Sequence, residues 1–212
     1  MWKCTEFRIS TGFFALLGLS LAWGAGEVLP HVLLSALCHE LGHLAALRLF
    51  GVYPERITLT ALGAEITAAG QDKLSYGGEL LTVLAGAAVN IVLALVFAHV
   101  SGDYLFAGTN AILAAYNLLP IRGLDGHRAL YLILAWCTEP FTAERVAGVV
   151  NLIVLALLLG FGVVLLVRTG SGVFCLSGAL GLCIGQLVRR NRKQNCISRG
   201  NRGCQTTKKQ IQ

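Results

Sequence analysis

The residues best suited to chemistry stand together in the string HELGH, over residues 39–43. In a helix, positions i and i+4 lie on one face, so the imidazoles of His39 and His43 can bind one zinc ion. Glu40 lies beside them and can take a proton from the attacking water and deliver it to a leaving amine. The alternative is that these groups line a helix interface or a proton path. Burying them in lipid is costly unless they are coordinated, which favours the metal.

A catalytic zinc site needs a third protein ligand and an open position for water. The candidate is Asp125, in the string NLLPIRGLDG over residues 117–126. Pro120 ends or kinks a helix, and Gly123 and Gly126 let the backbone turn Asp125 back toward an ion. Asn117 offers an amide that could polarise a carbonyl or hold an oxyanion. Two alternatives stay open: Asp125 caps a helix, or the amide of Asn117 bonds carbonyls that Pro120 leaves without a donor.

The composition indicates that the elements holding these groups lie in a membrane. The chain has 212 residues, of which 55% are hydrophobic and 13% are charged. Average globular chains carry about 25% charged residues. This excludes a disordered chain and a soluble enzyme with a large polar surface. The seven cysteines include no CxxC pair, so neither a disulfide framework nor a cysteine zinc finger is indicated.

Six stretches are long enough to cross a bilayer as helices, which takes about 20 residues each. One, Val28–Phe50, carries the HELGH string, and the other five lack Asp, Glu, Lys and Arg. Lipid offers backbone groups no partners, so each span must be a helix. The sequence therefore predicts an all-α polytopic membrane protein with about six transmembrane helices. For the first of the other five, Ile9–Gly26, a cleaved signal peptide is the alternative. The five stretches are Ile9–Gly26, Leu80–Gly102, Tyr104–Ile121, Val146–Val167 and Thr169–Val188.

The basic residues set the expected orientation. With both termini in the cytoplasm, all of the 17 Lys and Arg residues except Arg168 lie on the cytoplasmic side. Residues 1–188 form the membrane domain, and residues 189–212 form a basic cytoplasmic tail that is expected to be disordered and to contact anionic lipid. Nucleic acid is not an expected partner, because the tail has no interleaved aromatic residues. The tail is expected to be too short for a PDZ or CBS domain.

The loop between the second and third predicted spans has a β pattern. Arg56–Thr60 and Glu65–Ala68 alternate and are rich in β-branched residues, with residues 61–64 able to turn. This predicts a short β-hairpin, with an irregular loop as the alternative. Such strands could hold an extended substrate segment by strand addition.

Together, HELGH and NLLPIRGLDG resemble the site-2 protease family of intramembrane zinc metalloproteases, which pairs an HExxH helix with a later NxxP…LDG segment. The resemblance covers about residues 28–135, and AGAAVN over residues 85–90 resembles the family's GPxxN segment, with Ala87 replacing proline. An alternative for that helix is that its small residues allow close packing. The resemblance implies that His39, His43 and Asp125 bind Zn2+, that Glu40 activates water, and that the site opens to the cytoplasm.

The resemblance is closest to the compact bacterial branch, like stage IV sporulation protein FB, without its CBS domain. It implies a multi-pass protein of the bacterial inner membrane that performs regulated intramembrane proteolysis. The implied substrate is a transmembrane or membrane-associated protein, such as a sigma-factor precursor or an anti-sigma factor. A departure is His127, where the family often has a second glycine. One alternative is a non-catalytic scaffold or chaperone that retains the fold, and another is a small transporter with a proton relay. The sequence does not indicate the oligomeric state.

Overall fold

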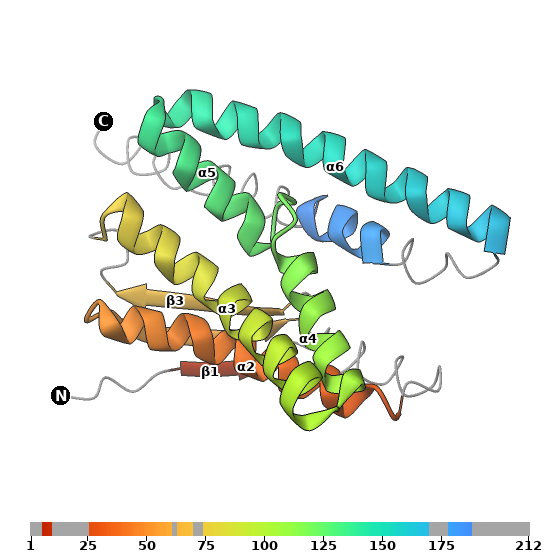
Figure 1. The fold of residues 1–212 in the computed structure, drawn as a ribbon. Helices are drawn as coiled ribbons and strands as arrows, with labels where there is room; N and C mark the ends of the chain where they lie inside the picture. Colours follow the sequence, from red (N-terminus) through yellow and green to blue (C-terminus); the bar gives the residue numbers. More distant parts are fainter. Residues whose placement is uncertain (1–5, 10–25, 61–62, 70–73, 170–177, 188–212) are drawn as a thin grey trace, which may run out of the picture. The chain divides into compact units, whose positions relative to one another are not determined.

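The computed structural model describes residues 6–9, 26–60, 63–69, 74–169 and 178–187 (Figure 1). Most of these residues are helical, and three short strands form a small sheet. The helices are α2 (Leu29–Leu49), α3 (Tyr76–Val96), the π-helical turn η2 (Phe97–Ser101), α4 (Tyr104–Asn117), α5 (Asp125–Cys137), α6 (Pro140–Thr169) and an unlabelled Gly178–Leu187. The strands are β1 (Glu6–Ile9), β2 (Tyr53–Thr60) and β3 (Gly63–Ala69). The chain divides into two compact units, Met1–Val154 and Leu155–Gln212.

Three helices in the described ranges are long and apolar enough to cross a membrane: Leu29–Leu49, Tyr76–Ser101 and Pro140–Thr169. Large apolar side chains on them are exposed, such as Leu81 at 63% and Leu152 at 64%, as suits contact with lipid. These features are those of a membrane protein. The count of six spans stays a prediction, because residues 10–25 of the first predicted span and residues 170–177 and 188 of the last lie outside the described residues. The predicted tail, residues 189–212, also lies outside them.

Local signals set the helix boundaries near the candidate site. The Ser75 hydroxyl accepts a hydrogen bond from the Gly78 N–H at 3.2 Å, and the Asp103 carboxylate accepts one from the Phe106 N–H at 3.0 Å, so both cap the helices that follow. Helix α4 ends at Asn117, short of Pro120, whose ring disfavours helical geometry in the preceding residue. The predicted span Tyr104–Ile121 was therefore too long at its C-terminal end.

The three strands form a sheet in the order β1-β2-β3. Strands β2 and β3 are antiparallel, with Ile57 opposite Ile66, and they occupy the stretches whose alternation predicted strands. Strand β1 lies parallel to β2, with Phe7 opposite Ile57. The Arg56 Nε donates to Glu6 Oε2 at 2.9 Å across this pair. The sequence did not predict β1, because its partner lies far along the chain and no local pattern marks the pairing.

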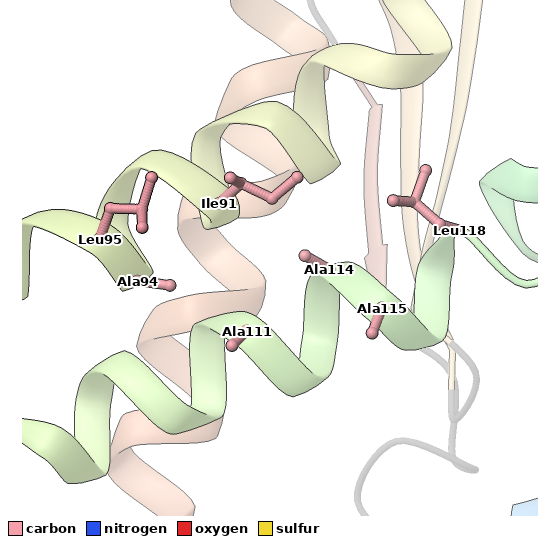
Figure 2. Close-up of a pocket in the computed structure, with 7 residues that line it drawn as sticks. All are labelled: Ile91, Ala94, Leu95, Ala111, Ala114, Ala115 and Leu118. Carbon is pink, nitrogen blue, oxygen red and sulfur yellow. The ribbon is translucent and has the colours of Figure 1, made fainter. Parts of the chain in front are cut away.

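Helix α3 is the centre of the first unit and contacts α2, α4 and α5. Its approach to α2 is close, since a Cβ added at Gly42 would lie 2.9 Å from the Ala85 carbonyl oxygen. On α5, Ala129 and Leu132 pack against Val83 of α3. Toward α4, α3 leaves a wholly apolar groove (Figure 2), lined by Ile91, Ala94, Leu95, Ala111, Ala114, Ala115 and Leu118. Glycine and alanine thus allow the close helix packing that the sequence predicted as one role for this segment.

Candidate metal centre

Helix α2 places His39 and His43 one turn apart on its buried face. The two imidazoles meet edge to face with ring centroids 4.7 Å apart, and their Nε2 atoms lie 3.1 Å from each other. Both side chains are buried, at 4% and 11% exposed. The i, i+4 spacing of HELGH therefore gives the convergence that the sequence predicted.

Asp125 reaches the same point from a different element. Its Oδ2 lies 2.9 Å from Nε2 of His39 and 3.1 Å from Nε2 of His43. Asp125 is the first residue of α5, and Leu124 is the cap residue, without a side-chain cap bond. The alternative that Asp125 caps this helix is thus wrong, because its carboxylate faces the histidines. All three donor atoms lie within 4.8 Å of one another.

The donor set and its surroundings fit a divalent transition metal. The His43 Nδ1 lies 2.8 Å from the Thr82 carbonyl oxygen, a contact in which the nitrogen must donate its hydrogen. The neutral ring then directs the Nε2 lone pair at the shared point, and carbonyl partners of this kind orient metal-binding histidines. Two imidazole nitrogens and one carboxylate oxygen match the protein ligands of catalytic zinc sites. No sequence signal pointed to Thr82, because its backbone carbonyl makes the contact.

Gly86 on α3 keeps room at the shared point. A Cβ at this position would overlap Nε2 of both His39 and His43. The segment resembling GPxxN therefore needs a glycine at 86 for a reason beyond helix packing. Asn90 follows one turn later; it is fully buried, and its side-chain amide has no hydrogen-bond partner within the described ranges.

The loop between α4 and α5 turns Asp125 toward the histidines. Ile121 is fully buried and Leu124 is nearly so, which anchors the loop on both sides of Gly123. Gly123 has a φ of 106°, a conformation that favours glycine. A Cβ at Gly126 would overlap the Leu118 carbonyl, so the loop folds directly over the start of α5. Gly123 thus has the turning role that the sequence predicted, whereas Gly126 lies within α5 and allows the close approach of the loop.

The other candidate residues named from the sequence lie on three different helices. Glu40 follows His39 on α2, is partly buried, and is close enough for its charge to act on His43. The Asn117 amide donates to the Leu113 carbonyl at 3.1 Å, within its own helix, so its catalytic role stays a prediction. His127 is half-buried on α5; burial lowers its pKa, the Arg122 guanidinium lowers it further, and Glu144 acts in the opposite sense.

No family model matches the chain. A zinc metalloprotease of Methanocaldococcus jannaschii is 28% identical over 159 residues, which are 70% of this chain and 45% of the relative. The chain thus spans less than half the length of that protein. The solved site-2 protease from Methanocaldococcus jannaschii matches with a TM-score of 0.66 and 23% identity, over 87% of this chain and 91% of the other. The chain has the fold of a site-2 protease.

Within this site-2 protease fold, the candidate metal centre is open on one side. The exposed fraction of the side chain rises from 4% at His39 to 25% at Asp125, so solvent reaches the group past the carboxylate. The histidines face α3, and Gly86 leaves no side chain between them and that helix. The donor atoms are therefore most accessible from the Asp125 side.

Proposed function

We propose that this protein is an intramembrane zinc metalloendopeptidase of the site-2 type, which cleaves a transmembrane or membrane-associated protein. The observation that carries the proposal is the convergence of His39, His43 and Asp125 on one buried point, from a membrane-length helix and from the start of α5. The similarity to a zinc metalloprotease supports zinc as the metal.

Each residue assigned to this site has a different role in peptide hydrolysis. His39, His43 and Asp125 would hold the zinc ion, which would supply a Lewis acid to polarise a peptide carbonyl and to make water more acidic. Glu40 takes the proton of the attacking water and passes it to the leaving amine. Asn117 donates to the developing oxyanion once its amide leaves the Leu113 carbonyl. Water enters past Asp125, which is the more exposed side of the group.

Replacing Glu40 distinguishes a protease from the alternative functions. A scaffold, a chaperone or a proton-relay transporter has no need of a base beside a metal. We expect Glu40→Gln to keep its zinc and to cleave a co-expressed membrane substrate about 10²–10⁴ times more slowly than wild type. Glu139→Gln is the matched control, because this exposed glutamate lies at the start of α6. Equal processing by wild type and Glu40→Gln would refute the protease, as would wild-type protein without metal in elemental analysis.

The orientation proposal follows from charge. We place both termini and the opening of the site in the cytoplasm, because the basic residues then lie inside with the exception of Arg168. The resemblance to the compact sporulation branch supports a bacterial inner membrane as the location. The basic tail, residues 189–212, contacts anionic lipid in this arrangement. The narrower proposal for the substrate is a sigma-factor precursor or an anti-sigma factor, as in the compact sporulation branch. Truncation of such a protein only when Glu40 is intact would support it.

The sheet is the proposed holder of the substrate. A helical peptide bond is shielded by its own hydrogen bonds, so the scissile segment must be extended before it reaches the metal. Strand β3 is the last in the order β1-β2-β3, and its outer edge can accept a further strand. Proline substitutions within residues 63–69 should reduce cleavage while zinc content stays the same. Unaltered cleavage in these variants would refute strand addition.

A further inference from the structure

Asn151 is an exception in α6, which has the highest mean hydropathy of the three membrane-length helices in the described ranges. It is the one polar side chain in the stretch Val146–Val167, and it is only 3% exposed. Burying an amide in an apolar helix is costly unless it is hydrogen-bonded. A buried polar residue in such a segment therefore points to a specific partner.

The partner is the backbone of the loop that directly precedes Asp125. The Asn151 Oδ1 accepts a hydrogen bond from the Arg122 N–H at 2.7 Å. Arg122 stands between Pro120 and Gly123, where the chain is outside any helix, so this N–H depends on a partner from another element. The contact therefore ties the middle of the loop to α6.

One face of α6 receives the loop. The Arg122 guanidinium pairs with Glu144 at 2.5 Å, and a Cβ at Gly148 would lie 3.3 Å from its Nη2. Glu144, Gly148 and Asn151 are spaced by four and three residues, which places them on the same side of the helix. The ion pair is about half exposed, so it contributes little energy, and the buried bond to Asn151 is the main attachment.

We propose that Asn151 is a positioning residue for the third metal ligand: it holds the loop at Arg122, and thereby holds the Asp125 carboxylate against His39 and His43. This rests on the metal site of the proposed function. Arg122 precedes Asp125 by three residues. Ile121, just before Arg122, and Leu124, just before Asp125, are both buried, so a displacement at Arg122 is transmitted to Asp125. Partners of this kind, outside the ligands themselves, commonly change metal affinity about 10–100-fold when they are removed.

The test compares three variants of the full chain purified in detergent. Asn151→Leu keeps the side-chain size but removes the acceptor, whereas Asn151→Asp keeps an acceptor in the same place. Asn110→Leu is the matched control, because Asn110 is also fully buried but its amide donates to the Phe106 carbonyl in its own helix. Zinc affinity is measured by competition with a chelator, and exchange of backbone amides is measured over residues 119–126.

We expect Asn151→Leu to bind zinc about tenfold more weakly and to exchange the loop amides faster, while Asn151→Asp recovers most of the affinity and Asn110→Leu matches wild type in both. Zinc affinity in Asn151→Leu equal to that of Asn110→Leu would overturn the proposal, whatever the amide exchange does. Wild-type protein that binds no zinc would overturn the proposed function instead. In that case loop exchange as slow in Asn151→Leu as in wild type would also remove Asn151 from any positioning role.

Discussion

The two parts of the candidate metal centre are held in different ways. Helix α2 supplies His39 and His43 by spacing alone, since any regular helix puts these positions on one face. The loop before α5 supplies Asp125 through a buried anchor, a left-handed glycine and a bond to another helix. The helical ligands therefore depend on local sequence, and the loop ligand depends on residues from several elements.

Removing a helical ligand should have the largest effect. We expect His43→Ala to weaken zinc binding by about a hundredfold or more, because a few ligands share the roughly 10–16 kcal/mol of a structural zinc site. The measurement is zinc content after dialysis against a chelator. His99→Ala is the control, since His99 is exposed on η2. Zinc retained by His43→Ala at the wild-type level would show that α2 does not supply a metal ligand through His43.

The next effect is expected at the start of α5. Gly126→Ala places a Cβ on the Leu118 carbonyl, and backbone atoms cannot move aside cheaply. We expect the unfolding midpoint to fall by an amount equivalent to about 1–3 kcal/mol, with weaker zinc binding, because the loop must shift. Thermal unfolding in detergent with and without zinc measures both. Gly108→Ala, whose added Cβ meets nothing within 4 Å, should not be destabilised.

Gly86→Ala tests the space on the other side of the histidines. Its Cβ overlaps Nε2 of His39 and His43, which are side-chain atoms that can rotate away. We therefore expect zinc affinity to fall about tenfold, with a smaller loss of stability than in Gly126→Ala. Chelator competition and thermal unfolding together separate the two glycines. If Gly86→Ala binds zinc as tightly as Gly108→Ala, the close approach of α3 does not shape the metal site.

The smallest effect is expected at the surface of the loop. Glu144→Gln removes the ion pair with Arg122, which is about half exposed, so the free energy of unfolding should change by less than about 1 kcal/mol. Zinc affinity should stay within about twofold of wild type, because Asn151 still holds Arg122. A loss as large as that of Asn151→Leu would assign the attachment to the ion pair.

The sequence could predict those parts of the site that depend on spacing. HELGH predicted the meeting of His39 and His43, and the resemblance of NLLPIRGLDG added Asp125. The Thr82 carbonyl was out of reach, because its contact depends on how α2 and α3 align and not on the type of residue 82. Asn151 was visible as a lone polar residue, but its partner is a backbone group 29 positions away.

The prediction of the fold was limited in the same way, to what local patterns in the sequence can indicate. Apolar length and alternation indicated the helices and the stretches that form β2 and β3, since both signals are local. Pro120 indicated that a helix ends nearby, and the structure places the end at Asn117. Strand β1 has only four residues and pairs with β2 across a helix, so no pattern within it could identify its neighbour.

The parallel pairing of β1 with β2 also limits how the chain can lie relative to the bilayer. Neighbouring strands of one sheet must lie on the same side of the bilayer, so β1 and β2 share one side. Strand β2 begins at Tyr53, four positions after α2 ends at Leu49, so the sheet holds β1 at the membrane surface where α2 ends.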